Sequence, residues 1–419
     1  MQRPKPHTVQ NTYLALTLMN TLAASFIWGI NTLFLLDAGL TNAQAFLANA
    51  FFTVGQVVFE VPTGMVADLR GRQTSYLLGA LTLSAATFLY WGAWMMHAPF
   101  WAWAITSILL GLGFTFFSGA TEAWLVDAMA FAKFKGELDS VFAKSQSVGG
   151  FAMLAGSIAG GIIAQMTNLG VPYLLRAGLL LATFAVAAIY MKDWGFKPDK
   201  MVSLKADVTR LFATSIDLGL RKPAVRWVML GAPFATGVGF YVFYAMQPHL
   251  LNLYGDPNAY GIAGLAAAIV AGTQIVGGLI APTIRRAFRL RTSVLLTCEV
   301  ASVGMLLFLG FVSGFWQAIV LVSVWGLLSA AITPVRQAYL NTLIPSKQRA
   351  TVLSFDSLMG SVGGVVIQPT LGRVADIGGY AQSFLASGLI QAIALPFAVL
   401  ARRENMRAER VAAPASFTR

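Results

Sequence analysis

The chain has 419 residues, of which 57% are hydrophobic and only 11% are charged, and its formal net charge is +12. Soluble domains carry about a quarter charged residues, so this composition excludes a water-soluble enzyme, a disordered chain and a disulfide scaffold. The apolar residues form runs of about 20 or more, the length a helix needs to cross a bilayer. The alternating pattern of membrane barrel strands is absent from the sequence. The sequence therefore predicts a polytopic α-helical membrane protein.

Twelve apolar runs, separated by charged residues, glycine or proline, are long enough to be membrane spans. The first six cover residues 12–36, 44–67, 74–96, 100–128, 143–166 and 172–192. The second six cover residues 225–251, 259–284, 292–313, 315–343, 351–378 and 381–402. The stretch between them is the longest polar segment of the chain. We therefore expect an N-terminal bundle (1–192), a cytoplasmic linker (193–224) and a C-terminal bundle (225–419).

Basic residues mark one side of the predicted membrane region. Lys and Arg gather at the even-numbered junctions, in the central stretch and after the last span, and the opposite loops are almost free of them. Arg176 and Arg373 are the exceptions near the opposite face. Because cytoplasmic loops carry the excess of Lys and Arg, we expect a multi-pass protein of the cell membrane with both termini in the cytoplasm. The same rule explains the positive charge without a nucleic-acid partner.

The two halves of the chain are related by a constant offset of 214 residues. The run GMVADLRGR at 64–72 is matched by GLIAPTIRR at 278–286, and the tetrapeptide SVGG occurs twice at the same offset. The offset also relates Glu122 to Arg336. Six spans per half preserve orientation, so the halves are predicted to be parallel repeats, an arrangement in which the substrate path lies between two rocking halves.

The loop between the second and third predicted spans reads Gly64-Met-Val-Ala-Asp68-Leu-Arg-Gly71-Arg72-Gln73. This run resembles the G-x-x-x-D-x-x-G-R-[RK] signature of the major facilitator superfamily. Gln73 stands where a basic residue is usual, and Pro282 replaces the acid in the second copy. With the twelve spans and the internal repeat, the resemblance covers essentially the whole chain. It implies an all-α membrane fold of two pseudo-symmetric six-helix bundles.

The residues of this loop suggest a gate on the cytoplasmic side. Gly64 and Gly71 permit close helix approach and a tight turn. Asp68 is an anion placed to meet the positive N-terminus of a neighbouring helix, which the resemblance implies is the eleventh span. Asp127 is a candidate partner for Arg72. We expect these contacts to form while the cytoplasmic side is closed; the alternative is a basic loop that only sets topology.

Charged residues inside the spans are the candidates for proton coupling. A charge at mid-bilayer costs about 2.5–3.5 kcal/mol on insertion scales, so its presence suggests a function. The repeat places Glu122 and Arg336 where they could pair across a central path, and a carboxylate that alternates between Arg and water could change its proton affinity. Glu60 in the second span is the other candidate carboxylate. The alternative is that both acids form static pairs near the cytoplasmic ends, as we expect for Glu299 and Asp356.

Polar and aromatic side chains within the spans are the candidate cavity lining. Lipid would not satisfy side-chain amides, which favours a cavity for the polar ones. The candidates are Asn20, Asn31, Gln56, Phe240, Tyr244, Gln247 and Gln274. Such a lining would suit amphipathic or aromatic compounds, although each single aromatic residue could equally face lipid or pack in the core.

The fifth predicted span contains Gly156-Ser-Ile-Ala-Gly160-Gly161. This run resembles part of the superfamily's antiporter motif, with Ser157 in place of proline, and favours export. The alternative is small-residue helix packing, which implies no transport direction.

The leading hypothesis is therefore a secondary transporter of the drug/proton antiporter type, which exports a small amphipathic or hydrophobic molecule in exchange for protons. The alternatives are a proton-coupled importer of a small metabolite and a receptor that keeps the fold without transport. The sequence has no nucleotide loop, no histidine cluster with metal spacing and no nucleophile–base pair, so we expect no enzyme activity, cofactor or metal. The expected partners are the substrate, protons and the lipid bilayer, and we expect a monomer.

Overall fold

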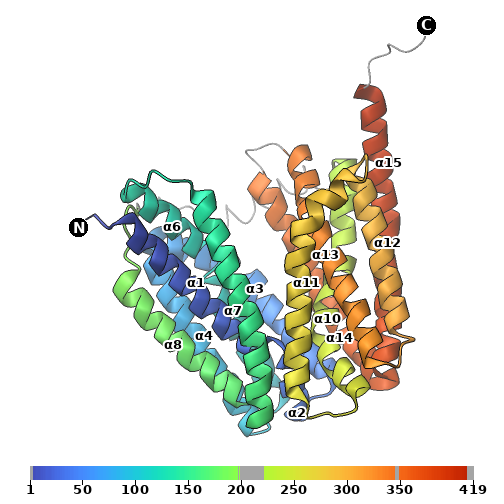
Figure 1. Ribbon diagram of the computed structural model, residues 1–419, viewed down its shortest axis with the longest axis horizontal. Coiled ribbons are helices and arrows are strands. Elements are labelled where there is room, and N and C mark those ends of the chain that lie inside the picture. The colour runs from blue at the N-terminus through green and yellow to red at the C-terminus, as the bar shows by residue number, and fades with distance from the viewer. Residues whose placement is uncertain (1–2, 197, 199–220, 345–348, 413–419) are drawn as a thin grey trace. The chain divides into compact units, whose positions relative to one another are not determined.

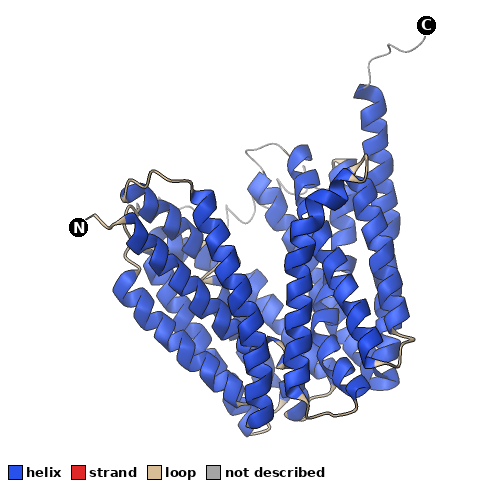
Figure 2. Ribbon diagram, in the orientation of Figure 1, coloured by secondary structure: helices blue, strands red, loops and turns tan. Residues whose placement is uncertain are grey.

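The computed structural model describes residues 3–196, 198, 221–344 and 349–412 of the chain. Within these residues all regular secondary structure is helical (Figure 2). Lipid offers no partners to backbone N–H and C=O groups, and a helix satisfies them within the segment. Most of the predicted linker, residues 197 and 199–220, lies outside the described residues.

The first half of the chain forms eight helices in the structure. They are α1 (Pro6–Trp28), α2 (Asn31–Asp37), α3 (Asn42–Arg70), α4 (Arg72–Met95), α5 (Phe100–Thr115), α6 (Ala120–Phe131), α7 (Leu138–Met166) and α8 (Val171–Tyr190). The first predicted span is a bent pair, because α1 and α2 meet at an angle of 47°. The fourth predicted span is interrupted where Gly119 adopts a φ of 68°, between α5 and α6.

The second half forms fewer but longer helices. They are α10 (Pro223–Tyr254), α11 (Tyr260–Arg286), α12 (Arg291–Leu309), α13 (Phe315–Leu343), α14 (Arg349–Ala392) and α15 (Ala394–Ala412). Inside α14 the backbone leaves the helical region at Gly379, whose φ is 79°. The eleventh and twelfth predicted spans adjoin at this glycine.

The helices account for the twelve predicted spans. Ten helical stretches of the described chain are long and apolar enough to cross a membrane, and the bent pair of α1 and α2 makes eleven. One of the ten, Val352–Glu404, has 53 residues, more than twice the ~20 that one span needs. Because the break at Gly379 divides this stretch, it supplies two spans rather than one.

By its internal contacts the chain divides into two compact units. Unit 1 comprises Met1–Leu204 and Tyr244–Gly272, and unit 2 comprises Lys205–Phe243 and Thr273–Arg419. The division therefore passes through α10 and α11. The end of α10 and the start of α11 belong to the same unit as the first eight helices, although the sequence repeat places them in the second half.

Unit 1 is built around α1, which lies beside α7 and α8 (Figure 1). The α1–α7 contact depends on Gly160, because a Cβ there would lie 1.9 Å from the Phe26 carbonyl oxygen. One buried cluster of this unit includes Phe34, Tyr90, Trp103 and Tyr173. The Phe34 and Tyr173 rings stack with centroids 3.9 Å apart. Close packing of this kind holds membrane helices together, since lipid chains are as apolar as the helices themselves.

Unit 2 is centred on α12, which packs against α13, α14 and α15. Its helices are joined by buried polar contacts as well as by packing. The Tyr241 hydroxyl donates to Ser383 Oγ over 2.6 Å, and a Cβ at Gly363 would lie 2.0 Å from the Pro233 carbonyl oxygen. Side-chain hydrogen bonds between helices contribute to association within a bilayer, where water does not compete for them.

Candidate functional site

The break between α1 and α2 is bridged by a side chain from the second half of the chain. In an unbroken helix the Thr32 N–H would donate to the Trp28 carbonyl four residues earlier. Here the Thr32 N–H donates to Gln247 Oε1 at 3.0 Å, and Gln247 Nε2 donates to the Trp28 carbonyl at 2.7 Å. The Gln247 amide thus stands between the donor and the acceptor of the missing helical bond. We call these two hydrogen bonds the Gln247 bridge.

A third hydrogen bond joins the same segments. The Thr32 hydroxyl donates to the Tyr244 carbonyl at 2.9 Å. Gln247 is 1% exposed and Thr32 is fully buried. A buried backbone group without a partner is costly in a membrane. These three hydrogen bonds therefore stabilise the break and hold α10 against the α1–α2 segment.

A buried polar cluster lies beside the Gln247 bridge. Asn31 Nδ2 donates to Asn49 Oδ1 at 2.9 Å, and the Tyr173 hydroxyl donates to Asn31 Oδ1 at 3.0 Å. These residues come from α2, α3 and α8, and all three are buried. The cluster also includes Arg176, whose electrostatic neighbours are tyrosines. In the sequence, Arg176 is marked only as an exception to the positive-inside rule. We refer to Asn31, Asn49, Tyr173 and Arg176 as the unit 1 polar cluster.

Three of the seven candidate cavity residues therefore come together in unit 1. Asn31, Tyr244 and Gln247 lie at the Gln247 bridge and the polar cluster, where they make hydrogen bonds between helices rather than line open space. The other four are elsewhere: Asn20 and Gln56 are half-buried, Gln274 is exposed, and Phe240 packs against Gly364.

The glycines of the antiporter-like run face two different helices. A Cβ at Gly156 would lie 2.7 Å from Ser25 Cβ of α1, and a Cβ at Gly161 would lie 2.5 Å from the Tyr260 carbonyl oxygen of α11. With Gly160 against Phe26, α7 is held closely against both partners. The Gly261 N–H also donates to Gln165 Oε1 at 2.9 Å. The start of α11 is thereby fixed to the end of α7.

The two candidate coupling carboxylates of unit 1 have no cationic partner among the described residues. Glu60 Oε1 accepts a hydrogen bond of 2.8 Å from the Ser118 hydroxyl, just before the break between α5 and α6. Glu122 lies in the first turn of α6 and makes no hydrogen bond or ion pair with the described chain. Both side chains are exposed. A negative charge in the first turn of a helix is favoured by the helix dipole.

The charged residues of unit 2 are paired. Arg336 binds Asp356 in a bidentate ion pair, in which Nη2 donates to Oδ1 at 2.6 Å, and it also donates to the Val228 carbonyl. Glu299 accepts a hydrogen bond of 2.9 Å from Gln391 Nε2. Arg336 thus has a carboxylate partner within its own unit, and pairing with Glu122 stays a prediction. The Glu299–Gln391 hydrogen bond joins α12 to α14, and the Arg336–Asp356 ion pair joins α13 to α14.

In the signature loop Arg72 has a different partner from the one the sequence suggests. Arg72 Nη1 contacts Asp68 Oδ1 at 2.5 Å, four residues earlier, instead of Asp127. Asp68 lies only four residues before Arg72 in the chain, and this holds the two side chains close together. The guanidinium also lies 6.0 Å from the centre of the Phe196 ring. A Cβ at Gly64 would meet no atom within 4 Å, so no close approach requires glycine there.

Asp193, at the start of the predicted linker, completes this loop and was not anticipated from the sequence. Its Oδ1 accepts a hydrogen bond of 2.8 Å from the Gln73 N–H. Gly71 has a φ of 106°, and a Cβ there would lie 2.2 Å from Asp193 Oδ2, so only glycine fits. Burial raises the pKa of the Asp193 carboxyl, and the hydrogen bond from Gln73 opposes this shift.

Gln73, the departure from the signature, also has a structural role. Its Nε2 donates to the carbonyls of Ala187 and Ala188 at 3.1 Å each. The Ala187 carbonyl also accepts from the Met191 N–H and the Ala188 carbonyl from Lys192 Nζ, so Gln73 adds a second donor to each carbonyl at the end of α8.

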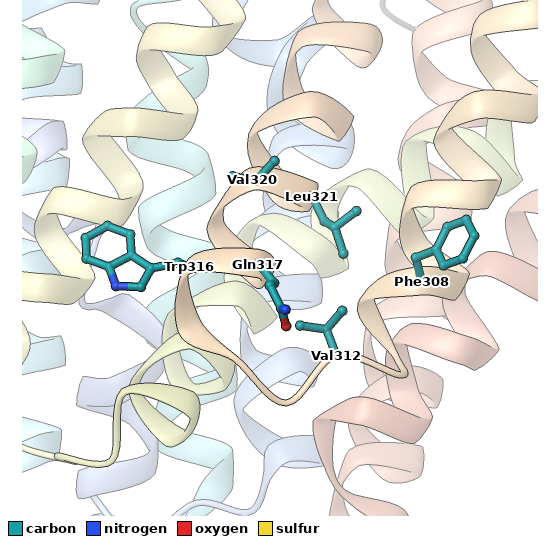
Figure 3. Close-up of a pocket in the computed structure, with 6 residues that line it drawn as sticks. All are labelled: Phe308, Val312, Trp316, Gln317, Val320 and Leu321. Atoms are coloured by element: carbon teal, nitrogen blue, oxygen red, sulfur yellow. The ribbon is translucent and has the colours of Figure 1, made fainter.

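Two surface hollows of unit 2 do not resemble a substrate site. A groove of about 540 Å³ between the end of α12 and the start of α13 is lined by Phe308, Val312, Trp316, Gln317, Val320 and Leu321 (Figure 3). Trp316 is 75% exposed and the lining is almost wholly apolar, as expected for a surface that faces lipid chains. A smaller hollow of about 160 Å³ lies among Arg285, Arg289 and Arg291.

Comparison with known proteins agrees with this architecture. A model of the Major Facilitator Superfamily matches residues 13–301 and 289–417. Similar solved structures include a mutant of the nucleoside transporter NupG, with 12% identity, 94% of this chain and 99% of that chain covered, and a TM-score of 0.78. No curated protein matches the chain.

Two further structures have the same fold. A bacterial homologue of the human lysosomal transporter Spinster, in an inward-facing and unoccupied conformation, has 15% identity, with 96% of this chain and 98% of that chain covered and a TM-score of 0.71. The POT family transporter PepTSo has 12% identity, with 96% and 99% covered and a TM-score of 0.74. At these identities the likeness shows the fold alone.

Proposed function

The chain belongs to the Major Facilitator Superfamily, and from this membership we propose that it is a secondary transporter that exports a small amphipathic molecule in exchange for protons. Members of this family transport small molecules by alternating access. The export direction, the proton coupling and the class of substrate are our proposal, as are the placement in the cell membrane, the cytoplasmic termini and the monomeric state.

The contrast between paired and unpaired carboxylates carries the proposal of proton coupling. Glu60 and Glu122 lie in membrane helices with no cation beside them in the described chain, whereas Asp356 is bound to Arg336. A carboxylate without a fixed counter-charge changes its proton affinity strongly when its access to water changes. Alternating access changes the exposure of the substrate path, so Glu60 and Glu122 are suited to bind a proton on one side and release it on the other.

The Gln247 bridge supports a role for unit 1 in opening and closing. By the positive-inside rule the α1–α2 break lies at the non-cytoplasmic face. We propose that this face opens when Gln247 leaves Trp28 and Thr32, and that the two backbone groups then bond to each other or to water. The bridge is suited to such a change because its partners are four residues apart and can close the helix themselves.

Purified protein in liposomes tests the proposal. An imposed pH gradient should drive accumulation of an amphipathic compound, found first in a susceptibility panel, with proton movement in the opposite direction. Glu122→Gln and Glu60→Gln should each abolish coupled proton movement, while Glu137→Gln, an exposed acid outside the spans, should not. Proton movement in the same direction as the substrate would instead identify an importer.

A transport-inactive receptor is the second alternative, and the same preparation distinguishes it. A receptor should bind its ligand without moving it, and Glu122→Gln and Asp68→Asn should leave its activity unchanged. The panel should be repeated after the proton gradient is dissipated. If no compound changes susceptibility in either condition, drug export is excluded.

A further inference from the structure

A buried arginine in unit 1 has no counter-charge within the described part of the chain. Arg176 is the sixth residue of α8, about 7.5 Å along the helix from its first residue, and is 9% exposed. Its electrostatic neighbours are Tyr173 of the same helix, Tyr244 of α10 and Tyr90 of α4. Tyr90 and Tyr173 are themselves buried. No carboxylate of the described residues forms an ion pair with Arg176.

One N–H of the buried guanidinium also lacks a hydrogen bond within the described chain. Arg176 Nε is buried and has no partner among residues 3–196, 198, 221–344 and 349–412. A guanidinium carries five N–H donors and keeps its charge at any physiological pH, so it cannot reduce the cost of burial by losing a proton. Buried charges in proteins are normally paired or hydrogen-bonded, and arginines in membrane segments pair with acids or carbonyls. Arg176 is an exception that requires an explanation.

Two buried donors of the unit 1 polar cluster have no partner among the described residues. The Asn31 oxygen is used by the Tyr173 hydroxyl, and the Asn49 oxygen is used by the Asn31 amide. Asn49 Nδ2 is buried and has no partner within the described chain. Two donors, Arg176 Nε and Asn49 Nδ2, are therefore left in one connected group. The missing component is an acceptor, and beside a fixed positive charge the best acceptor is an anion.

We propose that Arg176 is a substrate-binding residue that holds the carboxylate of an organic anion. The planar guanidinium fork matches the two oxygens of a carboxylate, which would neutralise the charge and supply the missing acceptor. The buried aromatic cluster that includes Tyr90 and Tyr173 provides contact for the apolar part of the anion. This inference rests on the proposed function and narrows its substrate class from amphipathic molecules to amphipathic carboxylates.

The position of Arg176 suits such a site. Tyr244, one of its neighbours, accepts the Thr32 hydroxyl hydrogen bond next to the Gln247 bridge. A carboxylate bound to Arg176 would therefore lie near the segment that we propose to open, with Tyr244 common to both. The interior of the cluster is reached only when these contacts separate, so binding and opening are coupled through α10.

Binding of four defined probes to the full chain in detergent tests the site. The probes are benzoate and decanoate, with the neutral analogues benzamide and decanamide. Tryptophan fluorescence reports binding because Trp103 contacts Tyr90 at a centroid distance of 4.8 Å. Carboxylates should change the fluorescence and raise the unfolding midpoint in a saturable way, with at least tenfold higher affinity than their neutral analogues.

Variants assign the binding to Arg176. Arg176→Gln should remove the preference for the carboxylate, and Arg176→Lys, which keeps the charge but not the fork, should weaken carboxylate binding about tenfold. Arg373→Gln is the matched control, because Arg373 is the other arginine near this face and is exposed. If Arg176→Gln fails to fold, the lysine variant and Tyr173→Phe still measure the site.

Three outcomes would overturn the site. These are equal binding of carboxylates and neutral analogues, full binding to Arg176→Gln, and an equal effect of sodium chloride, which would identify an inorganic anion site. The proposed function fails separately: a protein that binds carboxylates but moves no protons refutes the exchange and keeps the site. Proton exchange with neutral compounds alone refutes the site and keeps the exchange.

Discussion

Two arginines in the helices, the buried Arg176 of unit 1 and the half-buried Arg336 of unit 2, have opposite surroundings. Arg336 of α13 has a bidentate carboxylate partner, Asp356 of α14, and a third contact to the Val228 carbonyl. The electrostatic neighbours of Arg176 of α8 are tyrosines, and it forms no ion pair among the described residues. A paired buried charge connects helices, whereas an unpaired one is free to bind a ligand. The difference separates a structural contact from a candidate binding site without reference to sequence position.

The same comparison applies to the acids. Glu299 accepts a hydrogen bond from Gln391 and is 8% exposed, whereas Glu122 makes no such bond in the described chain and is exposed. Charged residues of unit 2 thus hold its helices together. In unit 1, Glu122 and Arg176 form no ion pair within the described chain, and these are the residues for which we propose roles with protons and substrate.

The largest effect is expected at the paired arginine. Arg336→Gln leaves the Asp356 carboxylate buried without a counter-charge, and breaking such a pair costs about 3–5 kcal/mol. The unfolding midpoint in detergent should fall strongly. The double variant Arg336→Gln with Asp356→Asn should recover part of the loss. Equal destabilisation by the single and double variants would show that the charge pair is not the cause.

The next largest effect is expected at the Gln247 bridge. Gln247→Leu leaves the Trp28 carbonyl and the Thr32 N–H without their present partner, and each unsatisfied buried group costs about 1–3 kcal/mol. Amide hydrogen exchange of α2 should therefore rise by tenfold or more. Gln317→Leu, an exposed glutamine in the groove of Figure 3, should leave exchange unchanged. Unaltered exchange in α2 would mean that the bridge does not hold the break.

Replacing the unpaired arginine should have the opposite sign. Arg176→Met removes a buried charge that gains nothing from a partner, so the ligand-free protein should become more stable by about 1 kcal/mol or more. Thermal unfolding of Arg176→Met, compared with that of the control variant Arg373→Met, measures the difference in stability. A fall in the midpoint comparable to that of Arg336→Gln would show that Arg176 has a stabilising partner and would remove the contrast between the two arginines.

The smallest effect is expected at Asp193, a half-buried acid outside the spans. Burial raises its folded-state pKa above the value of about 3.9 for a free carboxyl, so the folded state holds the proton more tightly. Its contribution to stability is complete below the unfolded pKa and is lost as pH rises through the folded pKa. Relative to Asp193→Asn, the wild type should gain stability as pH falls from 7 toward the free-carboxyl pKa of about 3.9.

The change should be small, no more than about 2 °C in the midpoint, since 1 kcal/mol corresponds to about 2–4 °C in a chain of 150–250 residues. Glu137→Gln serves as the comparison, because Glu137 is exposed on a loop. A wild type that loses stability relative to Asp193→Asn over this range would indicate that hydrogen bonds to the carboxylate outweigh its burial.

Much of the fold could be predicted because the bilayer makes length and hydropathy decisive. The spans and the signature loop are visible in the sequence, and the family match and the fold agree with the twelve-span architecture. The site was predicted less well. Arg72 pairs with Asp68 rather than Asp127, and Asp193 takes a place in the loop that no motif announces. Residue type limits which partners are possible, but it does not choose among them.

The amino-acid sequence alone determined that this is a helical membrane protein of two related halves. A bilayer is crossed by long apolar helices, and the 214-residue repeat is visible in the sequence. Only the tertiary structure decided that Gln247 stands in the broken helix, that Arg336 pairs with an acid and that Arg176 pairs with none in the part of the chain that is described. Those outcomes depend on which side chains meet across the chain, 20 residues apart for Arg336 and Asp356 and 219 for Gln247 and Trp28. Such contacts follow from the packing of helices and not from any local pattern.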